Sequence, residues 1–78
     1  MYVLGYSQQQ KLNTLANLLN QGYYVVAEVK GNTGQHWVAV VSVDNGKITM
    51  MDPGSESTDM WGRYYWGNTS TFSYFKVV

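Results

Sequence analysis

The segment Gln35–Val43 carries apolar side chains at both odd and even positions. Because successive side chains of a strand point to opposite faces of a sheet, this run predicts a central strand that is covered on both faces. The chain has 78 residues, which is enough for one small domain. The strands on both sides of this central strand must therefore belong to the same domain. Hydrophobic residues make up 45% of the chain and aromatic residues 15%, which excludes a disordered tail and allows a thin core.

One helix is predicted ahead of this strand. Ser7 and Gln10 have the spacing of a capping box, in which a hydroxyl accepts from the third helical N–H and the glutamine side chain reaches back. Gly22 marks the other end, because the left-handed conformation of a C-cap favours glycine. We therefore place the helix at about residues 8–20. Its apolar side chains recur at helical spacing: Leu12, Leu15, Leu18 and Leu19.

The rest of the chain is rich in β-branched and aromatic residues, and clusters of turn residues separate these stretches. The pattern predicts five strand segments: Tyr23–Lys30, Gln35–Val43, Lys47–Asp52, Met60–Trp66 and Thr71–Val78. A turn is predicted at Gly31–Gly34. The predicted fold class is α+β, with one N-terminal helix packed on an antiparallel sheet of four or five strands in a single small domain.

Charge and cysteine content exclude several functions. Five basic and five acidic residues cancel, so no long-range field attracts nucleic acid or an anionic membrane. No stretch approaches about 18 apolar residues, so we expect no membrane insertion. No cysteine is present, which excludes disulfides, thiolate metal sites and a cysteine nucleophile within these residues. Met1–Tyr6 has no basic residue and no long apolar run, so it does not have the pattern of a signal peptide, and the localisation stays open.

Three acidic residues lie close together in the sequence after the third predicted strand. Asp52, Glu56 and Asp59 do not have the spacing of an EF-hand loop. We therefore predict no metal site, and nothing in the sequence indicates a cofactor.

His36 is the single histidine and lies at the start of the second predicted strand. It is either an ordinary polar residue at a strand end or a general base. In a three-residue loop over Asp44–Gly46, His36 lies opposite Gly54 and shares a sheet face with Asp52. A two-residue loop would place the two side chains on opposite faces. We predict the three-residue loop, and with it a histidine–carboxylate pair.

Such a pair is two thirds of a nucleophilic triad, in which the carboxylate fixes the tautomer of the imidazole. The missing member is the nucleophile. Cysteine is absent, and no serine of the chain lies in a Gly-x-Ser-x-Gly turn, so a serine nucleophile is not expected.

The stretch Leu15–Ser55 resembles the second half of the C39 peptidases, in their C39-like bacterial branch. The resemblance rests on Gly22 after a leucine pair, on "HWVAVV" at His36–Val41, and on "MDPGS" at Met51–Ser55. It covers roughly residues 12–55, with a weaker continuation through Phe72–Val78. It implies a papain-like fold, a hydrolase that acts on peptides, His36 as the catalytic histidine and Asp52 as the residue that orients it.

The chain departs from this family in its nucleophile. In C39 peptidases a cysteine opens a helix in the first half of the domain, and a glutamine before it forms the oxyanion hole. The chain has neither, and no glutamine matches: Gln8, Gln9, Gln10 and Gln35. Two interpretations remain open. The chain is a C-terminal subdomain of a full peptidase, inactive without its cysteine-bearing half, or it is a short relative that is not a peptidase.

A group of aromatic residues favours a second class of function. Trp61, Tyr64, Tyr65 and Trp66 lie within six residues, and exposed rings of this kind bind peptides or sugars. With Trp37 they are candidates for the surface of a non-catalytic module that binds peptide or cell wall, or for a homodimer interface. The alternative is that the rings alternate across a strand and fill the core, Trp61 and Tyr65 on one side and Tyr64 and Trp66 on the other.

Overall fold

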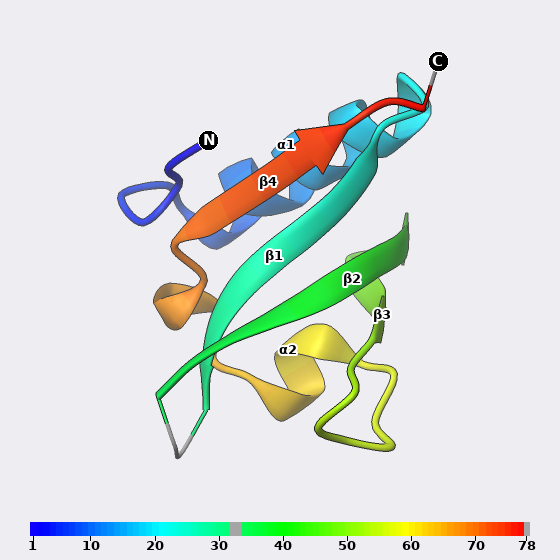
Figure 1. The fold of residues 1–78 in the computed structure, drawn as a ribbon. Coiled ribbons are helices and arrows are strands. Elements are labelled where there is room, and N and C mark those ends of the chain that lie inside the picture. The colour runs from blue at the N-terminus through cyan, green and yellow to red at the C-terminus, as the bar shows by residue number, and fades with distance from the viewer. Residues whose placement is uncertain (32–33, 78) are drawn as a thin grey trace.

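The computed structural model describes residues 1–31 and 34–77. It contains one long helix, four strands and two short helical turns: α1 (Gln8–Asn20), β1 (Tyr24–Gly31), β2 (Gly34–Asp44), β3 (Lys47–Met51), α2 (Met60–Arg63), η1 (Trp66–Asn68) and β4 (Thr71–Phe75). The strands form one antiparallel sheet in the order β3-β2-β1-β4, and α1 packs on it (Figure 1). The predicted α+β class is confirmed. The turn predicted at Gly31–Gly34 includes Asn32 and Thr33, which lie outside the described residues.

The helix has the bounds that its capping signals predict. The Ser7 hydroxyl accepts a hydrogen bond from Gln10 N at 3.1 Å, and Gln10 Oε1 accepts one from Ser7 N at 2.8 Å. Gly22 follows the helix with a φ of 86°, in the left-handed region that favours glycine. Within residues 1–31 and 34–77, no helix combines the length and apolar character needed to cross a membrane.

The hydrophobic core lies between α1 and one face of the sheet, which we call the inner face. Ala27, Val38 and Phe72 occupy the middle of three neighbouring strands on this face, and each is almost completely buried. Leu12, Leu15 and Leu18 of the helix belong to the same cluster of buried side chains. The predicted apolar stripe of the helix therefore packs on the sheet as expected.

The opposite, outer face of the sheet is open to solvent. Along β2, Trp37 is 41% exposed and Val41 is 51% exposed. Met51 on β3 is 69% exposed, and the rings of Tyr24 and Phe75 stack at 5.6 Å between β1 and β4 while both remain exposed. The prediction that the central strand is covered on both faces is therefore wrong in this structure. Apolar side chains at both parities identify a strand in the middle of a sheet but not a second covering layer.

The predicted fourth strand, Met60–Trp66, is not a strand. Its first residues form α2, because the Asp59 side chain accepts from Gly62 N at 3.1 Å and caps the turn. Glycine at position 62 leaves room for this cap, since a Cβ there would lie 2.6 Å from Asp59 Oδ2 and displace the carboxylate. Local capping thus overrides the strand preference of the aromatic residues, and the sheet has four strands. The last of them ends at Phe75 rather than Val78.

The hairpin between β2 and β3 differs from the prediction in its loop. Asp44 pairs with Lys47, so the loop has two residues, and the predicted three-residue loop is wrong. Asn45 and Gly46 have φ values of 51° and 79°, as a type I′ turn requires, and this turn matches the twist of the flanking strands.

A bulge in β2 then changes the register of the hairpin. Val40 pairs with Met50 and Ser42 with Thr49, so Val41 has no partner of its own on β3. The bulge shifts the pairing by one residue, the same shift that a three-residue loop would have produced. The start of β2 and the end of β3 therefore share a face, and the bulge rather than the loop is the cause.

Candidate functional site

His36 and Asp52 meet at the end of the sheet that lies away from the hairpin. His36 Nε2 lies 2.5 Å from Asp52 Oδ1. The Asp52 side chain is completely buried, whereas the His36 side chain is 32% exposed. The prediction that these two side chains share a face and form a pair is confirmed. The bulge at Val41 and the turn after β3 bring them together, not the loop on which the prediction relied.

The turn that follows β3 holds the carboxylate in place. Ser55 N donates to the Asp52 carbonyl at 3.2 Å, which closes a turn with Pro53 and Gly54 at its centre. Gly54 N donates to Asp52 Oδ1 at 2.8 Å, so the side chain accepts a hydrogen bond from its own turn. A Cβ on Gly54 would lie 3.4 Å from both His36 Nε2 and Asp52 Oδ1. The Asp-Pro-Gly-Ser sequence thus presents the carboxylate to the imidazole.

A third donor completes the surroundings of Asp52. The Tyr64 hydroxyl donates to Asp52 Oδ2, while His36 and Gly54 share Oδ1. Burial by itself raises the pKa of Asp52, but the hydrogen bonds from Tyr64, His36 and Gly54 outweigh burial and the net pKa is lowered. Burial and the neighbouring carboxylate raise the pKa of Tyr64, so its hydroxyl remains a donor. Asp52 is therefore an ionised, buried acceptor.

This arrangement sets the tautomer of His36. An ionised carboxylate only accepts hydrogen bonds, so the neutral imidazole carries its hydrogen on Nε2. Nδ1 then carries the free lone pair. His36 can therefore take a proton at Nδ1 while Asp52 stabilises the resulting imidazolium.

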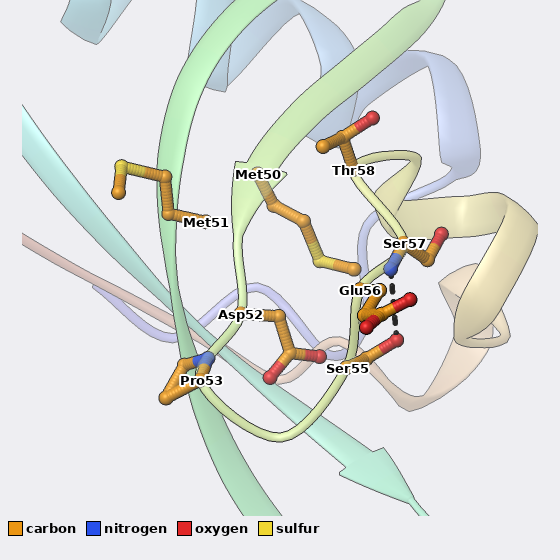
Figure 2. Close-up of a pocket in the computed structure, with 8 residues that line it drawn as sticks. All are labelled: Met50, Met51, Asp52, Pro53, Ser55, Glu56, Ser57 and Thr58. Carbon is orange, nitrogen blue, oxygen red and sulfur yellow. Dashed lines mark hydrogen bonds between the residues drawn. The ribbon is translucent and has the colours of Figure 1, made fainter.

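A groove of about 360 Å³ lies beside Asp52, between the end of β3 and the loop that follows it (Figure 2). Met50, Met51 and Pro53 give it an apolar wall, and Asp52 lies at its edge. The other wall is the polar part of the loop: Ser55, Glu56, Ser57 and Thr58. No spacing in the sequence indicates this groove, because it depends on the path by which the loop returns to β3. Met50 N donates to Thr58 O at 2.8 Å and fixes that path.

The five aromatic candidates do not form one surface. Trp37 lies on the exposed outer face of the sheet, opposite the face of His36. Tyr64 is buried, 7% exposed, against the core. Tyr65 is 63% exposed. The expectation that Tyr64 belongs to an exposed interface is therefore wrong, whereas Trp37 and Tyr65 are exposed as that expectation requires.

The two remaining tryptophans take part in packing. Trp61 packs against the core, and its Nε1 donates to Thr69 Oγ1 at 3.3 Å. The Trp66 ring lies 5.4 Å from Lys11 Nζ, in a cation–π contact. The predicted alternation, Trp61 with Tyr65 and Tyr64 with Trp66, is wrong because this segment is helical and turn-like rather than extended.

Acidic residues do not gather into a metal centre in the part of the chain that the structure describes. No group of three or more His, Asp or Glu side chains among those residues could hold a metal ion.

The lowered pKa of Asp52 predicts how the stability of the protein depends on pH. A carboxylate with a lowered pKa contributes stability above its ordinary value of 3.8, and this contribution is lost as pH falls through the folded-state value. Asp52→Asn is expected to lower the free energy of unfolding at pH 7 by about 2 kcal/mol, and the difference from the unmodified chain should narrow below pH of about 4. Urea unfolding followed by circular dichroism, at several pH values, measures this.

The control for that experiment is Asp44→Asn, because Asp44 is exposed at the hairpin. This variant should stay within about 0.5 kcal/mol of the unmodified chain throughout. If the free energy of unfolding of Asp52→Asn stayed about 2 kcal/mol below that of the unmodified chain in acid as well, Asp52 would not be a stabilising carboxylate.

Comparisons of the chain with models of protein families, with curated proteins and with solved structures give no match, so the resemblance to C39-like peptidases rests on the quoted residues alone.

Proposed function

We propose that the chain is the histidine-bearing subdomain of a C39-like cysteine peptidase, with His36 as the general base and Asp52 as the residue that orients it. The observation that carries this proposal is the contact between His36 Nε2 and the buried, ionised Asp52. It leaves Nδ1 as the basic atom of a side chain that is 32% exposed. An ion pair with a purely structural role does not require a partly exposed imidazole.

The nucleophile comes from a separate segment in this proposal. A thiol placed near Nδ1 gives its proton to His36, the thiolate attacks the substrate carbonyl carbon, and the imidazolium then returns the proton to the leaving amine. Asp52 stabilises the imidazolium between these two steps. Without the thiol and an oxyanion hole, the chain alone is expected to be inactive toward peptides.

A small thiol can stand in for the missing nucleophile in a test. We would measure release of p-nitrophenolate from p-nitrophenyl acetate as a function of N-acetylcysteamine concentration. The thiol-dependent rate is expected to be about tenfold higher for the unmodified chain than for His36→Ala, and Asp52→Asn should lose most of the gain. His36→Ala is expected to fold, at a cost of about 1 kcal/mol, since the side chain is partly exposed.

The assay includes two controls. Free imidazole at the same concentration sets the rate that an unpositioned base would give. Gln35→Ala changes an exposed neighbour on β2 whose side chain donates to Glu28, and it should leave the rate unchanged. Equal thiol-dependent rates for the unmodified chain, His36→Ala and free imidazole would refute the proposed base.

The groove beside Asp52 favours a second candidate function, a non-catalytic module that binds peptide. Its apolar wall of Met50, Met51 and Pro53 suits an apolar side chain, and the facing loop supplies polar groups. Titration with peptides, followed by NMR shifts of Ser55–Thr58, distinguishes the two functions. Binding that persists in His36→Ala, in a chain without thiol-dependent catalysis, would support the binding module.

A further inference from the structure

The loop after β3 starts and ends at the same carboxylate. Asp52 is its first residue, and Tyr64, which follows α2, is the residue whose hydroxyl donates to Asp52 Oδ2. In between, the loop returns alongside β3, where Thr49 and Asp59 form an isolated antiparallel bridge. The side-chain hydrogen bond therefore closes a loop whose walls also line the groove.

The position of Tyr64 is fixed from several sides. Tyr64 N donates to Met60 O at 2.8 Å, and Met60 is completely buried in the core. Asp59 caps the same short helix through Gly62 N. The Arg63 guanidinium lies 5.5 Å from the centre of the Tyr64 ring. A ring that is anchored in this way presents its hydroxyl to Asp52 from one direction.

The two oxygens of Asp52 have different partners, and this division matters for His36. Oδ1 accepts from His36 and Gly54, and Oδ2 accepts from Tyr64. Because the carboxylate is completely buried, loss of the Tyr64 hydroxyl would leave Oδ2 without a donor. Rotation of the carboxylate toward another donor would then withdraw Oδ1 from the imidazole.

We propose that Tyr64 is a positioning residue: its hydroxyl holds Oδ2, so that Oδ1 faces His36 Nε2 and the neutral imidazole keeps its hydrogen on that nitrogen. The ring centres of Tyr64 and His36 lie 6.2 Å apart, so Tyr64 also forms a side wall for the imidazole. The role assigned to Tyr64 in catalysis rests on the proposed function of His36, whereas its hold on Asp52 does not.

Tyr64→Phe tests the proposal, because it removes the hydroxyl and keeps the buried ring. The pKa of the Asp52 carboxyl, followed by carbon-13 NMR, is expected to rise in this variant, since the strongest of the interactions that lower it is lost. The thiol-dependent esterase rate is expected to fall by about threefold, less than the loss in His36→Ala, because Tyr64 acts on the base only through Asp52. Tyr65→Phe is the matched control, because Tyr65 is the exposed neighbour, and it should change neither quantity.

A measurement on the unmodified chain covers the case in which Tyr64→Phe does not fold. The Tyr64 hydroxyl proton should be visible by NMR, slow to exchange and shifted downfield, and it should lose this shift in Asp52→Asn. An Asp52 pKa that is the same in Tyr64→Phe, or a Tyr64 hydroxyl that exchanges freely, would overturn the assignment. If the unmodified chain shows no thiol-dependent rate while the Asp52 pKa rises in Tyr64→Phe, the proposed function fails and Tyr64 still holds the carboxylate.

Discussion

Phe72→Ala is expected to lower the free energy of unfolding by about 3–5 kcal/mol, the usual cost of removing a large buried aromatic ring. Phe72 is 0% exposed and lies on β4 beside Ala27, whose small side chain cannot fill the space that the ring would leave. A domain of this size has a total stability of about 4–12 kcal/mol. The variant should therefore lose a large part of its stability, and urea unfolding followed by circular dichroism measures the loss.

The same strand supplies the control. Phe75 is 52% exposed on the outer face, and its main contact is the stacked ring of Tyr24. Phe75→Ala is expected to cost no more than about 1.5 kcal/mol. Equal losses for the two variants would mean that the outer face is covered in solution, and that Phe75 is as buried there as Phe72.

Lys11→Met is expected to cost about 2–4 kcal/mol, a large effect for a lysine. Lys11 is 0% exposed, and its Nζ donates to Trp66 O at 2.9 Å and Thr69 O at 2.6 Å. Burial lowers the pKa of Lys11, yet its ammonium group satisfies two carbonyl oxygens of the segment between α2 and β4. Methionine fills the volume but leaves Thr69 O without its donor, at a cost of about 1–3 kcal/mol. It also removes the ammonium group from Trp66 O, which keeps only the hydrogen bond from Thr69 N.

Lys47→Met is the matched control, since Lys47 is exposed on β3. It should change the free energy of unfolding by less than about 0.5 kcal/mol. If Lys11→Met were as stable as this control, water would have replaced the ammonium group, and Lys11 would not hold α1 to the segment before β4.

The elements that the sequence predicts well are those set by local chemistry. The helix has its predicted bounds because the capping box of Ser7 and Gln10 and the glycine at Gly22 each act within a few residues. Strands β1, β2 and β3 follow β-branched residues between turn residues. The shared face of His36 and Asp52 was also predicted, although the extra residue lies at Val41 rather than in the loop.

The parts that sequence reasoning missed depend on long-range contacts. The aromatic residues of Met60–Trp66 predict a strand, and only the cap from Asp59 to Gly62 indicates a helical turn instead. The hydrogen bond from Tyr64 to Asp52 depends on where the whole loop returns, which no spacing in the sequence specifies. The role of Lys11 is hidden for the same reason, because its carbonyl partners lie more than fifty residues away in the chain.

The bulge at Val41 gives β2 one residue more than its pairing with β3 uses. Loss of one residue between Trp37 and Val41 can be absorbed when the bulge straightens, and His36 then keeps its place beside Gly54. The β3 strand has no spare residue in its paired stretch from Ile48 to Met51, so the same loss there would turn Asp52 toward the other face. Deletion of one residue is therefore expected to be tolerated on the histidine strand and to disrupt the site when it falls on the aspartate strand.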